Sequence, residues 1–250
     1  MDNAVNLFQR LNSKLFELFS SLSSEQWNKN LSGGNSKVQD IAIQLLDESR
    51  QSLFHFFNVS DLNDVQINSF QDFNPETYLS DLQIIHQQLD PYFNKIPAFS
   101  CLDKNSTLGI VALDLLKIYV KNWLYQQQIR QALGASLLLE ADFYQPFLEY
   151  CMRFLPKHFE NVYQANDTII SIEIVAETNL VWQLIRTEKA WDLVENQSYS
   201  DTQVYIDQNI AWILFSGGVD IYEASQYWQV IGNQDLGRHV LSLRPFDEEV

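Results

Sequence analysis

The sequence has 250 residues, with 32 Asp and Glu against 16 Lys and Arg, which gives a net charge of -16. An acidic chain without a cluster of basic residues repels phosphate backbones and anionic lipid, so we expect neither a nucleic-acid partner nor a membrane partner. Hydrophobic residues make up 46% of the chain, with only 8 Gly and 6 Pro, which is typical of a folded globular protein. The two cysteines have no Cys-x-x-Cys spacing and indicate neither a disulfide framework nor a cysteine-based zinc site.

The N-terminal residues lack the basic and apolar regions of an export signal, so we expect a cytoplasmic protein. Charge is unevenly distributed along the chain. Residues 1–134 carry 10 basic and 14 acidic side chains, a net charge of -4, whereas residues 135–250 carry 6 basic and 18 acidic side chains, a net charge of -12. The periodicity also changes after Gly134, which predicts a domain boundary there.

The first part has the apolar periodicity of four amphipathic helices. The first covers residues 3–22, and the second starts at a capping box formed by Ser36 and Gln39. Pro75 opens the third helix, and the fourth runs from about residue 106 to Gly134, where a glycine can end a helix. Asp114, Lys117 and Lys121 interrupt the most apolar segment, which favours a buried bundle helix over a membrane span. The pattern predicts an antiparallel four-helix bundle at residues 1–138.

The second part, residues 139–250, has a mixed pattern. A linking helix is predicted at about residues 140–159, followed by a hairpin of strands at 169–175 and 180–185. Further strands are predicted at 191–194 and 203–206, and short helices at 209–215, 221–227 and 235–243. The fold class is therefore α+β, with a small antiparallel sheet and helices on one face.

Two stretches of the sequence carry a resemblance to a known family. The first is residues 123–134, Trp-Leu-Tyr-Gln-Gln-Gln-Ile-Arg-Gln-Ala-Leu-Gly, and the second is residues 206–237, which include Ile206-Asp207, Gly217-Gly218 and Leu236-Gly237. Val38-Gln39-Asp40, Phe147 and Leu155-Pro156 fit the same pattern in the same order. The set resembles the mycothiol-dependent maleylpyruvate isomerase family of the DinB/YfiT-like superfamily: the first stretch resembles the end of the family's fourth helix and the second its second domain, a sterol-carrier-protein-like α+β module. The resemblance implies a DinB-like four-helix bundle followed by a sterol-carrier-protein-like domain.

In that family the bundle binds a divalent metal, usually zinc, through a His of the second helix and a Glu-x-x-x-His pair of the fourth. The resemblance places these ligand positions at Gln44, Lys121 and Tyr125. A neutral amide, an ammonium group and a neutral phenol are poor zinc ligands. We therefore predict a pocket at the former metal position, without the metal and without a cofactor, although the family would imply both a divalent metal and a low-molecular-weight thiol.

Two interpretations of Lys121 stay open. In the first, Lys121 donates hydrogen bonds to Gln44 and Tyr125 and pairs with Asp47, one helical turn from Gln44. In the second, its amine has a lowered pKa and acts as a base, a Schiff-base former or an anion-binding group. Following the resemblance, Arg238 is expected to contact an anion between the two domains, with a solvated helix residue as the alternative.

The four histidines share no helical ligand spacing, so they predict no replacement metal site. His55, among aromatic neighbours, is expected to be packed or half-buried, and His86 is expected at the edge of the apolar stripe. Tyr119 and Trp123 have the spacing of core aromatic residues, with an aromatic ligand site as the alternative.

The sequence leaves three functions open. The first is a non-catalytic or small-ligand-binding homologue without the family's metal site. The second is a thiol-dependent isomerase or thiol S-transferase that acts on a small electrophilic acid. The third is a structural or interaction module. We favour the first, because a metal that activates a thiolate is hard to replace by Gln, Lys and Tyr. The chain is expected to bind a small molecule and to act as a monomer or a homodimer.

Overall fold

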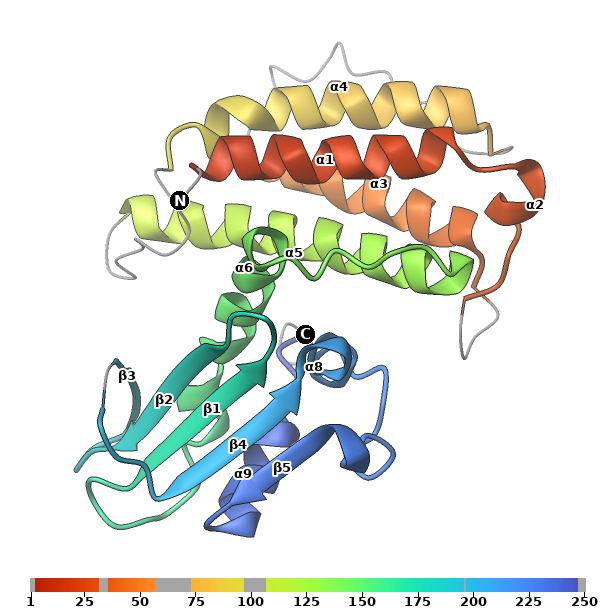
Figure 1. Ribbon diagram of the computed structural model, residues 1–250. Coiled ribbons are helices and arrows are strands. Elements are labelled where there is room, and N and C mark those ends of the chain that lie inside the picture. Colours follow the sequence, from red (N-terminus) through yellow and green to blue (C-terminus); the bar gives the residue numbers. More distant parts are fainter. Residues whose placement is uncertain (1–2, 32–35, 57–72, 97–106, 196, 247–250) are drawn as a thin grey trace. The chain divides into compact units, whose positions relative to one another are not determined.

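A computed structural model describes the chain except residues 1–2, 32–35, 57–72, 97–106, 196 and 247–250 (Figure 1). The chain divides into two compact units, Met1–Leu138 and Leu139–Val250. The first unit is helical and the second combines helices with a five-stranded sheet, so the predicted α+β class is confirmed. Among the described residues, no helix is both long enough and apolar enough to cross a membrane.

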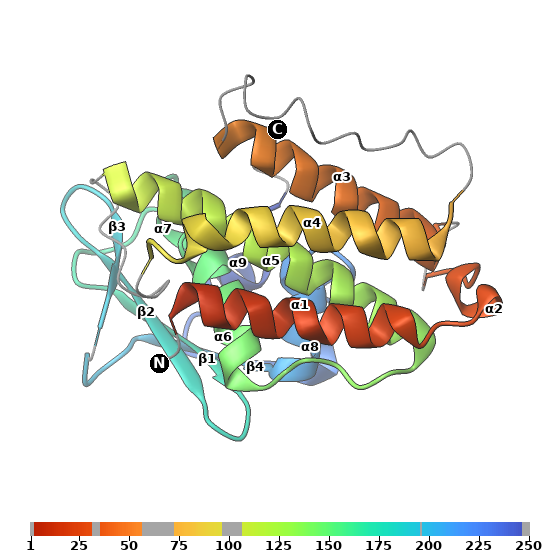
Figure 2. The ribbon, with the colours of Figure 1, turned by 90° about the horizontal axis from the view of Figure 1, so that it is seen from above.

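The helical unit contains four long helices that lie side by side (Figures 1 and 2). They are α1 (Ala4–Ser20), α3 (Val38–Phe56), α4 (Pro75–Phe93) and α5 (Thr107–Leu133), and a short α2 (Ser24–Trp27) follows α1. Helix α4 packs against α1 and α3, and α3 packs against α5. Helices α1 and α4 begin at N-cap residues: the side chains of Asn3 and Asn74 accept hydrogen bonds from the first-turn amides of α1 and α4, respectively.

The direction of the helices differs from the prediction in one respect. Helices α1 and α5 run one way and α3 and α4 run the other way (Figures 1 and 2), so α3 and α4 are parallel neighbours and the prediction of a fully antiparallel bundle is wrong for this pair. Residues 57–74 connect the two helices in the sequence. A connection of this length can span a 19-residue helix, about 28 Å long at 1.5 Å per residue, so the return to the same end is sterically allowed.

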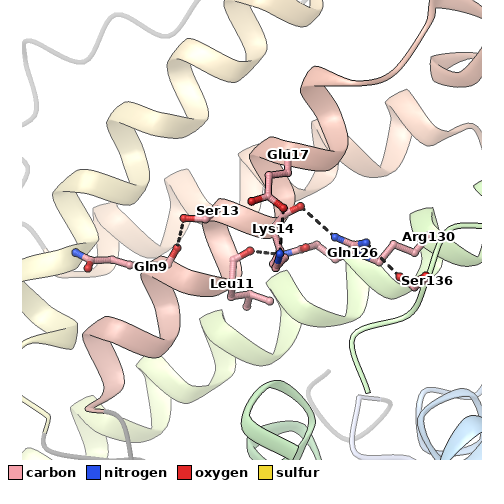
Figure 3. Close-up of polar contacts among 8 residues, drawn as sticks. All are labelled: Gln9, Leu11, Ser13, Lys14, Glu17, Gln126, Arg130 and Ser136. Carbon is pink, nitrogen blue, oxygen red and sulfur yellow. Dashed lines mark hydrogen bonds and ion pairs between the residues drawn. The ribbon is translucent and has the colours of Figure 1, made fainter. Parts of the chain in front are cut away.

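A buried polar ladder joins α1 to α5. The Asn122 amide nitrogen donates to Asn12 Oδ1 at 2.9 Å, and Gln126 donates to Asn122 Oδ1 at 2.9 Å and to the Leu11 carbonyl at 3.1 Å. Arg130 continues the ladder by donating to the carbonyls of Lys14 and Ser136, each at 3.1 Å (Figure 3). Because most of these polar atoms are buried and paired, they fix the register of α5 against α1.

The second unit begins with α6 (Ala141–Met152) and α7 (Leu155–His158). The sequence predicted one helix over about residues 140–159, and the structure interrupts it at Arg153 and Phe154. Pro156 lies in the first turn of α7, where its missing N–H is tolerated. The proline therefore marks a new helix start instead of a position inside one long helix.

The sheet consists of β1 (Ile169–Val175), β2 (Leu180–Arg186), β3 (Trp191–Val194), β4 (Thr202–Asp207) and β5 (Trp228–Ile231), in the order β3-β2-β1-β4-β5. Strands β1 and β4 are parallel, with Ile172 opposite Val204, and the other pairs are antiparallel. The predicted antiparallel sheet is thus corrected to a mixed sheet. The reason is topological: β2 and β3 extend the sheet on one side of β1, and the chain then returns to the other side.

Two further helices pack on this sheet, α8 (Gln208–Phe215) and α9 (Gln234–Leu241). The inward side chains of β1, Ile170, Ile172 and Ile174, are fully buried. Gly237 allows the close approach of α9, because a Cβ at this position would lie 2.4 Å from methyl groups of Val230 in β5. The predicted helix over residues 221–227 is wrong, since this segment forms turns and a single 3-10 turn, η3 (Ser225–Tyr227), before the unpredicted strand β5.

Candidate functional site

The three residues at the predicted metal position contact one carboxylate, that of Glu48 in α3. Gln44, one turn earlier in α3, donates its amide to Glu48 Oε1 at 3.2 Å. From α5, the Tyr125 hydroxyl donates a short hydrogen bond to the same Oε1, and Lys121 Nζ lies 3.2 Å from Glu48 Oε2 as an ion pair. We call these four residues the Glu48 cluster.

The pairing of Lys121 with Asp47, one of the two expectations, is wrong. Asp47 is exposed, whereas Glu48 and Lys121 keep only 25% and 30% of their side-chain surfaces exposed. Consecutive helical residues point about 100° apart, so only one of the two carboxylates can face α5. Glu48 lies four residues after Gln44 and Asp47 lies three residues after it, so the spacing made both carboxylates candidates and did not choose between them.

A cavity of about 300 Å³ lies between α3 and α5, beside the cluster. Lys121 and Glu48 line it, but Gln44 and Tyr125 do not: Gln44 is exposed, and Tyr125 is 8% exposed. The predicted three-residue pocket is therefore corrected to one that keeps Lys121 and adds Glu48. The complete lining is Leu45, Glu48, Ser49, Gln51, Ser52, Asp114, Lys117, Ile118, Lys121 and Asn122.

The electrostatics of the cluster keep its proton on tyrosine. Burial, the hydrogen bond to Glu48 and the negative charge of Glu48 together raise the pKa of Tyr125 far above its ordinary value of 10. The phenol therefore stays a neutral donor at physiological pH. Glu48 Oε1 accepts hydrogen bonds from Tyr125 and Gln44, while Oε2 faces the ammonium group.

These residues do not fit the divalent metal that the resemblance implies. An ammonium group, a phenol and an amide surround a single carboxylate, and a dication would have to displace Lys121 from Glu48. Elsewhere in the described parts of the chain, no three His, Cys, Asp or Glu side chains gather as a metal-binding group.

The histidines lie in unlike surroundings. His86 of α4 is 3% exposed, so its expected place at the edge of the apolar stripe is wrong; its ring contacts Phe8 and Phe16 at centroid distances of 5.3 and 6.1 Å. His158 and His239, which no helical spacing connects, stack with ring centroids 4.2 Å apart, and each Nε2 lies 2.9 Å from the other's backbone carbonyl. The side chain of His55 lies outside the described residues.

The remaining predicted residues are structural or exposed. Tyr119 and Trp123 are fully buried, as core aromatic residues, and the Trp123 indole donates to the Leu138 carbonyl at 3.0 Å. The Cys151 thiol is buried, which raises its pKa well above the ordinary value and makes it a poor nucleophile. Arg238 of α9 is half-exposed and lies 3.7 Å from Asp235; its predicted contact with an anion stays a prediction.

A comparison with known protein families and with curated protein sequences finds no match. The functional argument therefore rests on the residues and their geometry.

Proposed function

We propose that this protein is a divergent, metal-free relative of the DinB-like maleylpyruvate isomerase family, and that it binds a small organic acid in the cavity between α3 and α5. The resemblance supports the family, because its pieces occur in order over both units of the chain. A DinB-like bundle in the first unit and a sterol-carrier-protein-like second unit are part of this proposal. The Glu48 cluster supports the absence of the metal, because Lys121 supplies the positive charge on the α5 side.

The observation that carries the ligand proposal is the supply of hydrogen-bond donors around the cavity. Lys117 and Lys121 lie one turn apart on α5 and both line it, together with the buried Ser49 and with the Asp114 carboxylate, one turn before Lys117. Glu48 Oε1 accepts hydrogen bonds from Gln44 and Tyr125, and Oε2 forms an ion pair with Lys121, so the charge of Glu48 is paired within the cluster. A ligand that accepts hydrogen bonds and carries negative charge, such as a carboxylate, matches this lining.

The cavity also limits the size of the ligand. At about 300 Å³ it is at the lower end of the range for small-molecule sites, roughly 300–1,000 Å³. Leu45 and Ile118 supply an apolar part of the wall, which suits the short carbon chain of a small acid. This favours a compact mono- or dicarboxylate over a nucleotide or a lipid.

Thermal unfolding of the full chain with succinate, and with the matched diamide succinamide, tests the proposal. We expect succinate alone to raise the unfolding temperature, since a ligand at a hundred times its Kd adds about 2.7 kcal/mol of stability. Lys121→Met should remove this response while leaving a folded protein. Lys14→Met is the matched control, because Lys14 lies on α1, pairs with Glu17 and is absent from the cavity lining.

Three outcomes would contradict the proposal. Equal stabilisation by succinate and succinamide would show that the carboxylate is not recognised. An undiminished response in Lys121→Met would place the acid elsewhere. Stabilisation by zinc or by a glutathione-like thiol, without any response to the acid, would favour the thiol-dependent enzyme instead.

A further inference from the structure

Strand β5 forms an edge of the sheet in the second unit, and this edge is uncharged. It pairs with β4 on one side, with Ile206 opposite Trp228 and Gln203 opposite Ile231. Its four residues, Trp-Gln-Val-Ile, include no charged side chain and no proline. An edge strand of this kind offers backbone N–H and C=O groups to another extended chain, and proteins commonly blunt such edges with charges or proline.

The opposite edge of the sheet is blunted in this way. Strand β3 carries the exposed Asp192 in its centre, and Glu188, Lys189 and Glu195 flank it. At β5 the exposed side chains are uncharged instead: Gln229 is exposed, Ile231 is 49% exposed, and Tyr227, directly before the strand, is 44% exposed. The two edges of the sheet therefore differ in charge, and only β5 lacks the charged side chains that oppose pairing with another strand.

The sequence around β5 is mainly acidic. From residue 196 to residue 237 it contains no Lys or Arg and five acidic residues, which are Asp201, Asp207, Asp220, Glu223 and Asp235. Arg238 of α9 follows and lies 3.7 Å from Asp235. Acidic residues lie near both ends of β5. The Trp228 indole donates to the carbonyl of Ile221, next to Asp220, and Gly232 lies against the backbone of Asp201. A second copy of the same acidic edge would be repelled, whereas a basic segment would be attracted.

We infer that β5 is a docking edge for an extended segment of a partner protein that alternates basic and apolar residues. The segment adds a sixth strand to the sheet: its backbone pairs with β5, its apolar side chains cover Ile231, and its Lys or Arg side chains face the acidic residues at the strand ends. In the isolated chain, the Gln234 amide donates to the Val230 carbonyl at 3.0 Å and covers one of the acceptors of β5.

Fluorescence anisotropy of a labelled ten-residue Lys-Val repeat, titrated with the full chain, tests this inference. We expect binding that weakens with added salt. A Glu-Val repeat should not bind, and neither should a Lys-Val repeat in which every backbone nitrogen is methylated. Ile231→Lys should weaken binding of the Lys-Val repeat by about tenfold or more, because it places a like charge on the edge.

Val181→Lys is the matched control. Val181 is an equally exposed apolar residue, at 53%, in strand β2, which is paired on both sides, and its substitution changes the net charge by the same amount. Equal weakening by both substitutions, or retained binding of the methylated repeat, would reduce the interaction to non-specific charge attraction and overturn the inference. It would also be overturned if no repeat bound, or if sedimentation showed that Ile231→Lys dissociates a dimer, since the occupant would then be a second copy.

Discussion

Replacing His86 with leucine removes a titratable side chain from the core of the helical unit. His86 is 3% exposed, and neither ring nitrogen has a hydrogen-bond partner among the described residues. Burial lowers its pKa from 6.5 to about 3, because the charged form would lose its hydration among Phe8, Phe16 and other core residues. The folded protein thus holds this histidine neutral over a pH range in which the unfolded chain protonates it.

The sign and size of the effect follow from proton linkage. Below pH 6.5 the unfolded chain binds a proton that the folded chain excludes, so stability is fully present above pH 6.5 and is lost as the pH falls toward 3. With these two pKa values, the loss assigned to His86 reaches about 2 kcal/mol at pH 5. In His86→Leu this loss disappears. The variant should also be more stable at pH 7.5, by about 1 kcal/mol, because it no longer buries unpaired nitrogens.

Urea unfolding of the wild type and the variant, followed by circular dichroism at pH 7.5 and pH 5, measures the difference. All other titratable groups are the same in both proteins. The difference in unfolding free energy between the two proteins is therefore compared at the two pH values, and its change is assigned to His86. Gln87→Leu is the matched control, since Gln87 is the next residue of α4 and is exposed. The reasoning is refuted if His86→Leu and the wild type lose equal stability on acidification, or if Gln87→Leu reproduces the effect.

Two further substitutions test the interior of each unit, both by urea unfolding. Asn122→Leu should lower the unfolding free energy by about 2 kcal/mol, because it leaves the buried Asn12 amide without its partner. Adding Asn12→Leu should recover part of the loss, and strictly additive losses would contradict the Asn12–Asn122 hydrogen bond. Gly232→Ala should lower the unfolding free energy by about 2 kcal/mol or more, since its φ is +96° and a Cβ would lie 2.2 Å from the Asp201 carbonyl oxygen. Gly134→Ala, at φ +68° with no atom within 4 Å of the Cβ position, should lower it by about 1 kcal/mol, and equal losses would contradict the clash.

The long helices were predictable because their signals are local. The apolar stripe of α1, with Leu7, Leu11 and Leu15 buried, recurs at the spacing of a helix face, and Pro75 opens α4 where the sequence placed it. The relative direction of α3 and α4 has no local signal. It depends on where a long connection takes the chain, which periodicity does not encode.

The same distinction separates the strands that were predicted from those that were missed. Strand β1 contains a run of β-branched residues with alternating burial, so its pattern identifies it. Strand β5 has only four residues, too few for an alternation to stand out, and the residues before it have a helical composition. Its position at the edge beside β4, and hence its capacity to accept another strand, follows only from the order of the sheet.

The Glu48 cluster shows what the sequence could and could not say about the site. The ligand positions of the resemblance selected Gln44, Lys121 and Tyr125, and the structure brings all three to one carboxylate. The carboxylate itself was misassigned, because positions 47 and 48 both lie about one turn from Gln44 and only the packing of α3 on α5 decides which faces inward.

The Glu48 cluster bridges α3 and α5 with charges that belong to the chain itself. Glu48 of α3 contacts the Lys121 ammonium and the Tyr125 hydroxyl of α5. Because both the positive and the negative charge come from side chains, this bridge needs no ion. Replacing Lys121 with an acidic residue would place two carboxylates together, so we expect that change to weaken the contact between α3 and α5.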